Sequence, residues 1–286
     1  MNARALRDVS VLNADPKRRA ERRYLISGVG VSVVADDPIV RVLDVTMTHV
    51  QAHDEPCGVT LNVRKNGESW EIGDERGVMF KLPAETAAPE VTGALTSVLV
   101  DRVAQDTTAA LVSGVIVAKA DFAVALVGED WESAIAVAIH LSLRGWSIVT
   151  PRYSFVDPDT RTVEPFSKLL YIPSRIIPLL PLQYRRALEA SPWYATSNDL
   201  GFYGVDPLRA GTTAWVQKTT LRAGLIIDSS RRDLLGLVQE PAHGYIGACL
   251  PFSEVGIASA SLVMGAIVPT TDAVERWIGS FLPITA

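Results

Sequence analysis

The chain has 286 residues and 48% of them are hydrophobic, which is enough apolar material for one large core or two modest ones. Its formal net charge of −5 argues against a broad nucleic-acid interface, because such an interface needs a basic surface. The cysteines, Cys57 and Cys249, lie far apart without a C-x-x-C pair, which argues against a disulfide framework or a structural zinc site.

The first residues lack the apolar core of a signal sequence. The most apolar late run, 255–268, is shorter than the roughly 20 residues that span a membrane. We therefore expect a cytoplasmic protein with no membrane partner. Residues 1–23 are predicted to form a flexible basic tail, in which Arg18, Arg19, Arg22 and Arg23 make a small cluster.

Residues 24–106 are predicted to form a smaller α+β domain. The β-branched residues over 29–34 and 40–48 alternate, which favours strands. A hairpin is predicted from 59–64 and 69–72 around Asn66 and Gly67, because this pair tolerates the positive φ angles of a tight turn. A further strand is expected over 77–82. The stretch 90–105 reads as an amphipathic helix. Its apolar face consists of Val91, Leu95, Val98, Leu99 and Val103.

A buried strand is predicted over 122–128, followed by a loop and an apolar helix over 135–143. This order is typical of the phosphate-binding P-loop, G-x-x-x-x-G-K-[ST]. Only the first glycine, Gly128, is kept. Ser133 stands for the second glycine, Ala134 for the lysine and Ile135 for the hydroxyl residue. The loop also carries three carboxylates, which would repel a polyphosphate. Trp131 would either fill the pocket or offer an aromatic platform.

The flanking segments agree with this interpretation in order and spacing. They are 111–118, 122–128, 143–152, 155–160 and 164–166. Together they resemble the HPr kinase/phosphorylase-like family over roughly residues 100–210. The resemblance implies an α/β fold, in which an HPr-kinase-like P-loop domain with a mixed central sheet and helices occupies 107–286. It would follow the α+β N-terminal domain.

The positions that carry out catalysis in the family hold other residues here. The histidine before Gly114 is Ser113, and the Asp-Asp pair that would supply base and metal ligand is Pro151 and Arg152. We therefore expect a pseudokinase without cofactor, metal or catalytic residues. The resemblance suggests that it binds a peptide or protein partner, as an accessory protein that presents precursor peptides in ribosomal peptide natural-product biosynthesis. Two alternatives stay open. One is a divergent ATP-dependent kinase of proteins or small molecules that holds phosphate with Arg152 or Arg144, and the other is a structural subunit of a homo-oligomer.

After residue 165 the chain is rich in proline, which disfavours central strands and long helices. Aromatic and arginine side chains gather there, as they do on protein-binding surfaces. The candidate partner-binding residues are Tyr171, Arg175, Tyr184, Arg185, Trp193 and Tyr194. The alternatives are that these aromatics cover the core, or that a partner adds a strand to the edge of the N-terminal sheet. Strands are expected within 213–227, and helices over 231–239, 254–264 and 272–278.

Overall fold

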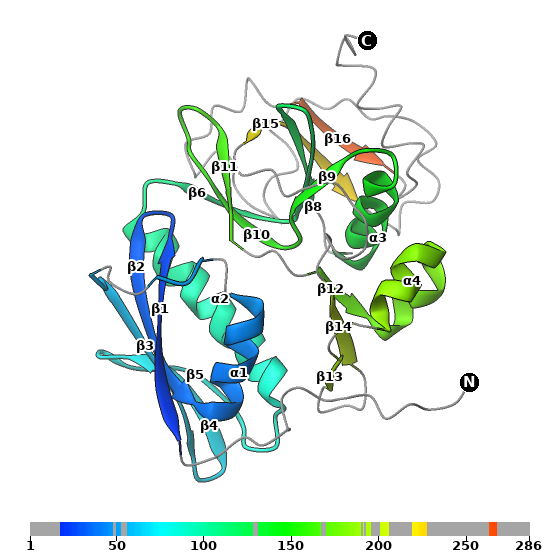
Figure 1. Ribbon diagram of the computed structural model, residues 1–286. Coiled ribbons are helices and arrows are strands. Elements are labelled where there is room, and N and C mark those ends of the chain that lie inside the picture. The colour runs from blue at the N-terminus through cyan, green and yellow to red at the C-terminus, as the bar shows by residue number, and fades with distance from the viewer. Residues whose placement is uncertain are drawn as a thin grey trace. The chain divides into compact units, whose positions relative to one another are not determined.

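The computed structural model describes residues 18–47, 50–52, 56–127, 131–166, 170–189, 191, 193–195, 201–205, 219–227 and 263–267. Its fold is mixed α/β, with helices and several sheets (Figure 1). The chain divides into two compact units. The first unit holds residues 1–108, 171–174 and 188–205, and the second holds 109–170, 175–187 and 206–286. Within the described residues no helix is both long and apolar enough to cross a membrane.

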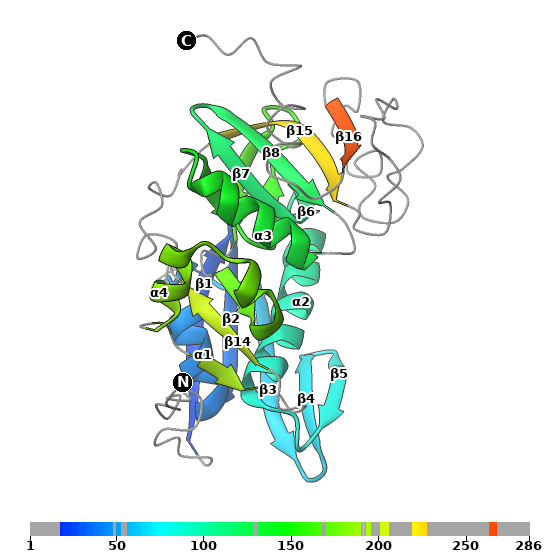
Figure 2. The same ribbon diagram turned by 90° about the vertical axis from the view of Figure 1, so that its right-hand side faces the viewer.

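A five-stranded sheet forms the body of the first unit, in the spatial order β1-β2-β3-β4-β5. Its strands are β1 (Arg19–Ile26), β2 (Val29–Asp36), β3 (Val59–Asn66), β4 (Ser69–Asp74) and β5 (Gly77–Pro83). Neighbouring strands are antiparallel except β2 and β3, which run parallel and are joined through helix α1 (Asp37–Thr46). Helix α2 (Ala88–Asp106) contacts α1, β3 and β5, so both helices cover one face of the sheet (Figures 1 and 2).

The strand predicted over 40–48 is wrong, because most of this segment belongs to α1. Pro38 lies in the first turn of α1, where its fixed φ and missing N–H are tolerated, and Asp37 adds a favourable negative charge there. The buried residues Ile39, Leu43 and Thr46 recur at helical spacing. Packing of this face against the sheet outweighs the strand preference of the β-branched residues, which is a weak local effect.

The flexible tail predicted over 1–23 ends earlier than expected, since residues 19–23 form the first part of β1. Arg19 pairs with Asp36 of β2 at 3.3 Å, and the Arg22 side chain binds Asp44 of α1. Arg19 and Arg22 are three residues apart in a strand, so their side chains point to opposite faces of the sheet and reach different carboxylates. These partners come from residues further along the chain, so the basic cluster gave no sign of them.

Other predictions of the first unit are confirmed. The β3–β4 hairpin is present, although Asn66 pairs with Ser69 and the turn residues are Gly67 and Glu68. Gly67 has φ +59°, the conformation for which glycine is suited. Strand β5 covers the segment predicted over 77–82. Helix α2 buries the apolar face predicted for it, and the Glu90 carboxylate accepts a hydrogen bond from the Ala87 N–H at its start.

The second unit is built on a mixed sheet with the strand order β6-β10-β11-β15-β8-β7-β9, and β16 pairs with β15. The strands are β6 (Ala110–Ser113), β7 (Val115–Lys119), β8 (Phe122–Val127), β9 (Ser147–Thr150), β10 (Tyr153–Val156), β11 (Thr162–Pro165), β15 (Thr219–Ile227) and β16 (Val263–Ile267). Strand β15 runs parallel to both β8 and β16. The run 111–118 is divided at Gly114 into β6 and β7, which pair with different strands.

Helix α3 (Trp131–Ser142) follows β8 and packs against β7, β8, β9 and β15 (Figure 2). The predicted strand and the helix after it are confirmed, but the helix begins at Trp131 instead of residue 135, and residues 128–130 between them lie outside the described residues. Four residues assigned to the loop are therefore helical. The reason is that Ala134 and Ile135 are buried, so the apolar face of the helix already starts in its first turn.

The described part of the proline-rich region contains short elements, as its composition predicts. They are β12 (Leu170–Pro173), the 3₁₀ helix η2 (Ser174–Leu179), α4 (Leu182–Leu188), β13 (Trp193–Ala195) and β14 (Gly201–Val205). The three strands form a separate sheet with the order β12-β14-β13. The strand expected within 213–227 is present as β15, whereas residues 263–264, predicted to end a helix, lie in β16. The helices predicted over 231–239 and 272–278 lie outside the described residues.

Candidate functional site

Three parts of the second unit meet at one end of its sheet, which we call the strand-end junction. They are the turn from β6 to β7, the end of β8 and the turn from β9 to β10. The Gly114 N–H donates a hydrogen bond to the Arg152 carbonyl at 2.6 Å. A Cβ atom at Gly114 would lie 2.7 Å from the Leu126 carbonyl oxygen and 2.8 Å from Val127 Cγ1. Only glycine allows these segments to approach so closely.

The junction brings together several positions that the sequence singled out. Ser113 is exposed at the end of β6 and pairs with Tyr153 of β10, so it lies close to Arg152. Pro151 is buried in the turn between β9 and β10, which is closed by a hydrogen bond from Thr150 Oγ1 to the Tyr153 carbonyl at 2.6 Å. Gly128 and the acidic residues 129–130 lie outside the described residues, as does the side chain of Ser133.

The two residues that stand at the lysine and hydroxyl positions of the P-loop pattern are part of the core. Ala134 is 2% exposed and Ile135 is 1% exposed, and α3 packs both against the sheet. A lysine at the first position would have to place its ammonium group in an apolar environment, which is unfavourable without a partner. Trp131 is 41% exposed at the start of α3. The exposed indole fits an aromatic platform better than a buried plug.

Arg152 is the exposed cation of the junction. Its guanidinium carbon lies 4.9 Å from the centre of the Tyr153 ring, in the range of a cation–π contact. Within the described ranges no carboxylate pairs with Arg152. The same part of the chain places no three His, Cys, Asp or Glu side chains where they could hold a metal ion. The arrangement can attract an anion through Arg152.

The residues proposed for partner binding are divided between the two units. Tyr171 and Trp193 lie half-buried on the three-stranded sheet of the first unit. Tyr171 meets the Phe202 ring edge-on at 5.1 Å between centres, and Trp193 lies 4.7 Å from the centre of Tyr203. Tyr194 belongs to the same sheet, but its side chain is not among those that the structure describes. This sheet therefore carries two aromatic pairs, Tyr171 with Phe202 and Trp193 with Tyr203. The pairs lie on opposite faces, because Phe202 and Tyr203 are consecutive residues of β14.

The other proposed partner residues belong to the second unit. Tyr184 is wrong as a contact residue, because it is fully buried and its hydroxyl shares a 2.9 Å hydrogen bond with Ser142 Oγ. Arg185 is exposed, but its guanidinium donates hydrogen bonds to the carbonyls of Leu180 and Pro178 at 2.7 and 2.9 Å. It therefore stabilises the end of η2. Arg175 lies in η2, with a side chain outside the description.

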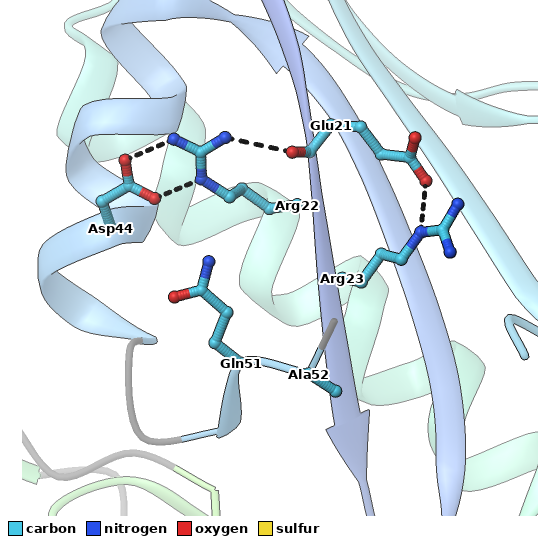
Figure 3. A pocket seen from close by; sticks show the side chains of 6 residues that line it. All are labelled: Glu21, Arg22, Arg23, Asp44, Gln51 and Ala52. Atoms are coloured by element: carbon cyan, nitrogen blue, oxygen red, sulfur yellow. Dashed lines mark hydrogen bonds and ion pairs between the residues drawn. The ribbon is translucent and has the colours of Figure 1, made fainter. Parts of the chain in front are cut away.

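Sequence reasoning missed a polar depression of about 610 Å³ in the first unit (Figure 3). Its lining residues are Glu21, Arg22, Arg23, Asp44, Gln51 and Ala52. Arg22 donates to the Asp44 carboxylate at 2.7 Å and to the Glu21 carbonyl at 3.0 Å. The bond to Asp44 raises the pKa of Arg22, and hydrogen bonds from Arg23 and then Ser32 lower the pKa of Glu21.

Each arginine of this depression already has a carboxylate partner, so the site offers an incoming anion no free charge. A ligand would have to break these ion pairs, which makes the depression a weak candidate. The alternation of arginine and glutamate over 19–23 was the available signal. It could not identify the depression, because Asp44 and Gln51 reach it only through the fold.

A comparison of the sequence with protein-family models and with curated proteins finds no match. The resemblance to HPr kinases therefore depends on the order and spacing of the residues named above.

Proposed function

We propose that this chain is a catalytically inactive kinase-like protein that binds a peptide or protein partner. Residues 107–286 would be a degenerate HPr-kinase-like P-loop domain, preceded by a smaller α+β domain over 24–106. In the cell it would act in the cytoplasm as an accessory protein that binds precursor peptides in ribosomal peptide natural-product biosynthesis. The observation that carries the proposal is the burial of Ala134 and Ile135 in the core.

Phosphoryl transfer depends on positioning and on neutralising the charge of the phosphates. A P-loop does this with a lysine and a metal-binding hydroxyl that face the ligand. Here the corresponding side chains, Ala134 and Ile135, are apolar and packed against the sheet. They therefore supply neither the cation nor the metal-binding hydroxyl. The family's base and metal positions hold Ser113, Pro151 and Arg152, which supply no carboxylate. These substitutions remove the phosphate clamp, the base and the metal ligands together.

Two surfaces of the first unit support partner binding. The three-stranded sheet offers two pairs of half-buried rings, with Tyr171 edge-on to Phe202 and Trp193 tilted against Tyr203, and rings held in this way lose little entropy when a partner covers them. The five-stranded sheet also ends in a strand with exposed apolar side chains. Extended peptides commonly bind to such edges through main-chain hydrogen bonds.

Calorimetric titration of the full chain tests the proposal. We expect heat on adding a precursor peptide and none on adding Mg-ATP. Tight binding of Mg-ATP, together with no heat from any precursor peptide, would overturn it.

The alternative function is that of a divergent ATP-dependent kinase, and the exposed Arg152 favours it. Its guanidinium is held over Tyr153, and its backbone carbonyl bonds Gly114, which lies against the end of β8, so Arg152 could replace the missing lysine. A thermal shift with Mg-ATP that disappears in Arg152→Ala would support this alternative.

A further inference from the structure

The outermost strand of the five-stranded sheet, β5, has an open edge. Figure 2 shows β5 at one end of the sheet, and among the described residues it pairs with β4 alone. Three consecutive apolar residues lie exposed on it: Val78 at 46%, Met79 at 45% and Phe80 at 44%. A long edge strand with apolar side chains is a template for pairing with another chain.

The opposite edge strand of the same sheet is protected. Strand β1 carries Arg19, Glu21 and Arg23, and charged side chains oppose the addition of a further strand. Its backbone is also partly occupied, because the Ala52 N–H donates to the Arg23 carbonyl at 2.9 Å and Tyr24 forms a bridge with Gln51. The two edges therefore differ within one sheet, and β5 is the one left able to accept a partner.

The register of β5 on β4 assigns its side chains to the two faces. Phe80 pairs with Ile72 and Leu82 with Trp70, and both β4 residues are buried on the face that carries α2. Successive side chains alternate between faces, so Lys81 lies on the other face, opposite Glu71. A strand added to β5 would thus find an apolar margin on the helix side and a charged margin on the other.

The charged margin has an excess of positive charge. The buried Glu71 carboxylate is paired with both Arg64 and Lys81, each at 3.1 Å. Hydrogen bonds from Lys81 and then Arg64 lower the pKa of Glu71, so it stays ionised. One buried negative charge is therefore shared between two exposed cations. The cluster retains a net charge of about +1, and Lys81 is its cation on the open-edge strand, where it would attract an acidic side chain.

We propose that β5 binds an extended peptide by strand addition, with apolar side chains of the peptide against Phe80 and acidic ones facing Lys81. This inference rests on the proposed peptide-binding function and assigns the site and the chemical class of the ligand. A second copy of the chain fits less well. Antiparallel pairing of two β5 strands about Phe80 would bring two copies of the cationic cluster close together on one face, and like charges across strands are unfavourable.

The test uses the full chain and two labelled eight-residue peptides, one alternating valine with glutamate and one alternating valine with lysine. Fluorescence anisotropy should show that the acidic peptide binds at least about tenfold more tightly than the basic one. Phe80→Gln should weaken the acidic peptide about tenfold, and Lys81→Glu should reverse the preference between the two peptides. Leu25→Gln is the matched control, since Leu25 is 40% exposed on the protected strand β1 and should leave both affinities unchanged.

Several results would overturn the inference. One is that the acidic peptide does not bind at concentrations up to about 1 mM. Another is that Phe80→Gln and Leu25→Gln weaken its binding equally. The third is that Lys81→Glu still binds the acidic peptide more tightly than the basic one. A concentration-dependent dimer that Phe80→Gln abolishes would assign the edge to a second copy instead. Thermal unfolding of each variant checks that it is folded. A precursor peptide that binds wild type and Phe80→Gln equally would refute this site while leaving the proposed function intact.

Discussion

Replacing Ala134 by lysine would restore the cation that a P-loop requires, and we expect the protein to lose stability instead of gaining nucleotide binding. The Ala134 side chain is 2% exposed and α3 packs against the sheet, so the new side chain has no direct path to water. Free lysine titrates at about pH 10.4, and keeping it neutral in an apolar site at pH 7 costs about 4–5 kcal/mol. Overpacking adds about 1–3 kcal/mol, and partial escape of the long side chain toward solvent recovers some of this cost.

We therefore expect Ala134→Lys to lower the free energy of unfolding by about 3–6 kcal/mol, a large part of the about 5–15 kcal/mol typical of a domain. Ala136→Lys is the matched control, because Ala136 lies on the same helix and is only half-buried. It should cost less than about 1 kcal/mol. Urea unfolding of the full chain at pH 7 measures both variants.

The loss should also depend on pH. Burial depresses the pKa of the new lysine in the folded state, so the unfolded chain binds more protons and stability rises with pH. Between pH 7 and pH 9 the deficit of Ala134→Lys should shrink by up to about 2.7 kcal/mol relative to the control. The reasoning is refuted if Ala134→Lys is as stable as Ala136→Lys at pH 7, and still more clearly if it then binds Mg-ATP.

Three further predictions concern single contacts. Tyr184→Phe removes the buried hydroxyl that bonds Ser142 and should lower the free energy of unfolding by about 0.5–1.5 kcal/mol in urea, whereas no change would contradict a buried hydrogen bond. The pKa of Asp157 is lowered by hydrogen bonds from the Thr160 backbone N–H and hydroxyl, so this carboxylate stabilises the fold above its ordinary pKa and the effect is lost as the pH falls through its folded value. The unfolding midpoint of Asp157→Asn should therefore decline less than that of wild type below about pH 4. The same decline in both proteins would count against this role of Asp157. Adding Mg-ATP should shift the thermal midpoint of neither wild type nor Arg152→Ala, since a ligand stabilises only the state that it binds.

Sequence reasoning succeeded where the decisive interactions are local. The turn at Gly67 is specified by one residue's conformational freedom, and α2 by apolar residues at helical spacing. The order of β8 and α3 could be predicted for the same reason. It failed for α1, because alternating β-branched residues favour a strand and only packing against the sheet reverses that preference.

The candidate sites depended more strongly on distant contacts. The burial of Tyr184 follows from its contact with Ser142, which lies on another helix. Asp44, the carboxylate partner of Arg22 in the polar depression, is likewise brought there by α1. The sequence predicted that a partner could add a strand to an edge of the N-terminal sheet, but not which strand forms that edge, because the order of the strands comes from the fold.

The parallel pairing of β8 with β15 has a consequence for synthesis on the ribosome. Phe122 pairs with Thr220, which follows it by roughly 100 residues, and contacts so distant in sequence form slowly. At about 5–20 residues per second, β8 is made several seconds before the strand that completes its side of the sheet. Its unpaired edge is exposed to wrong partners during that interval. We therefore expect chaperones to bind the nascent second unit before β15 is made. The strands of the five-stranded sheet are close in sequence and can pair as soon as they emerge.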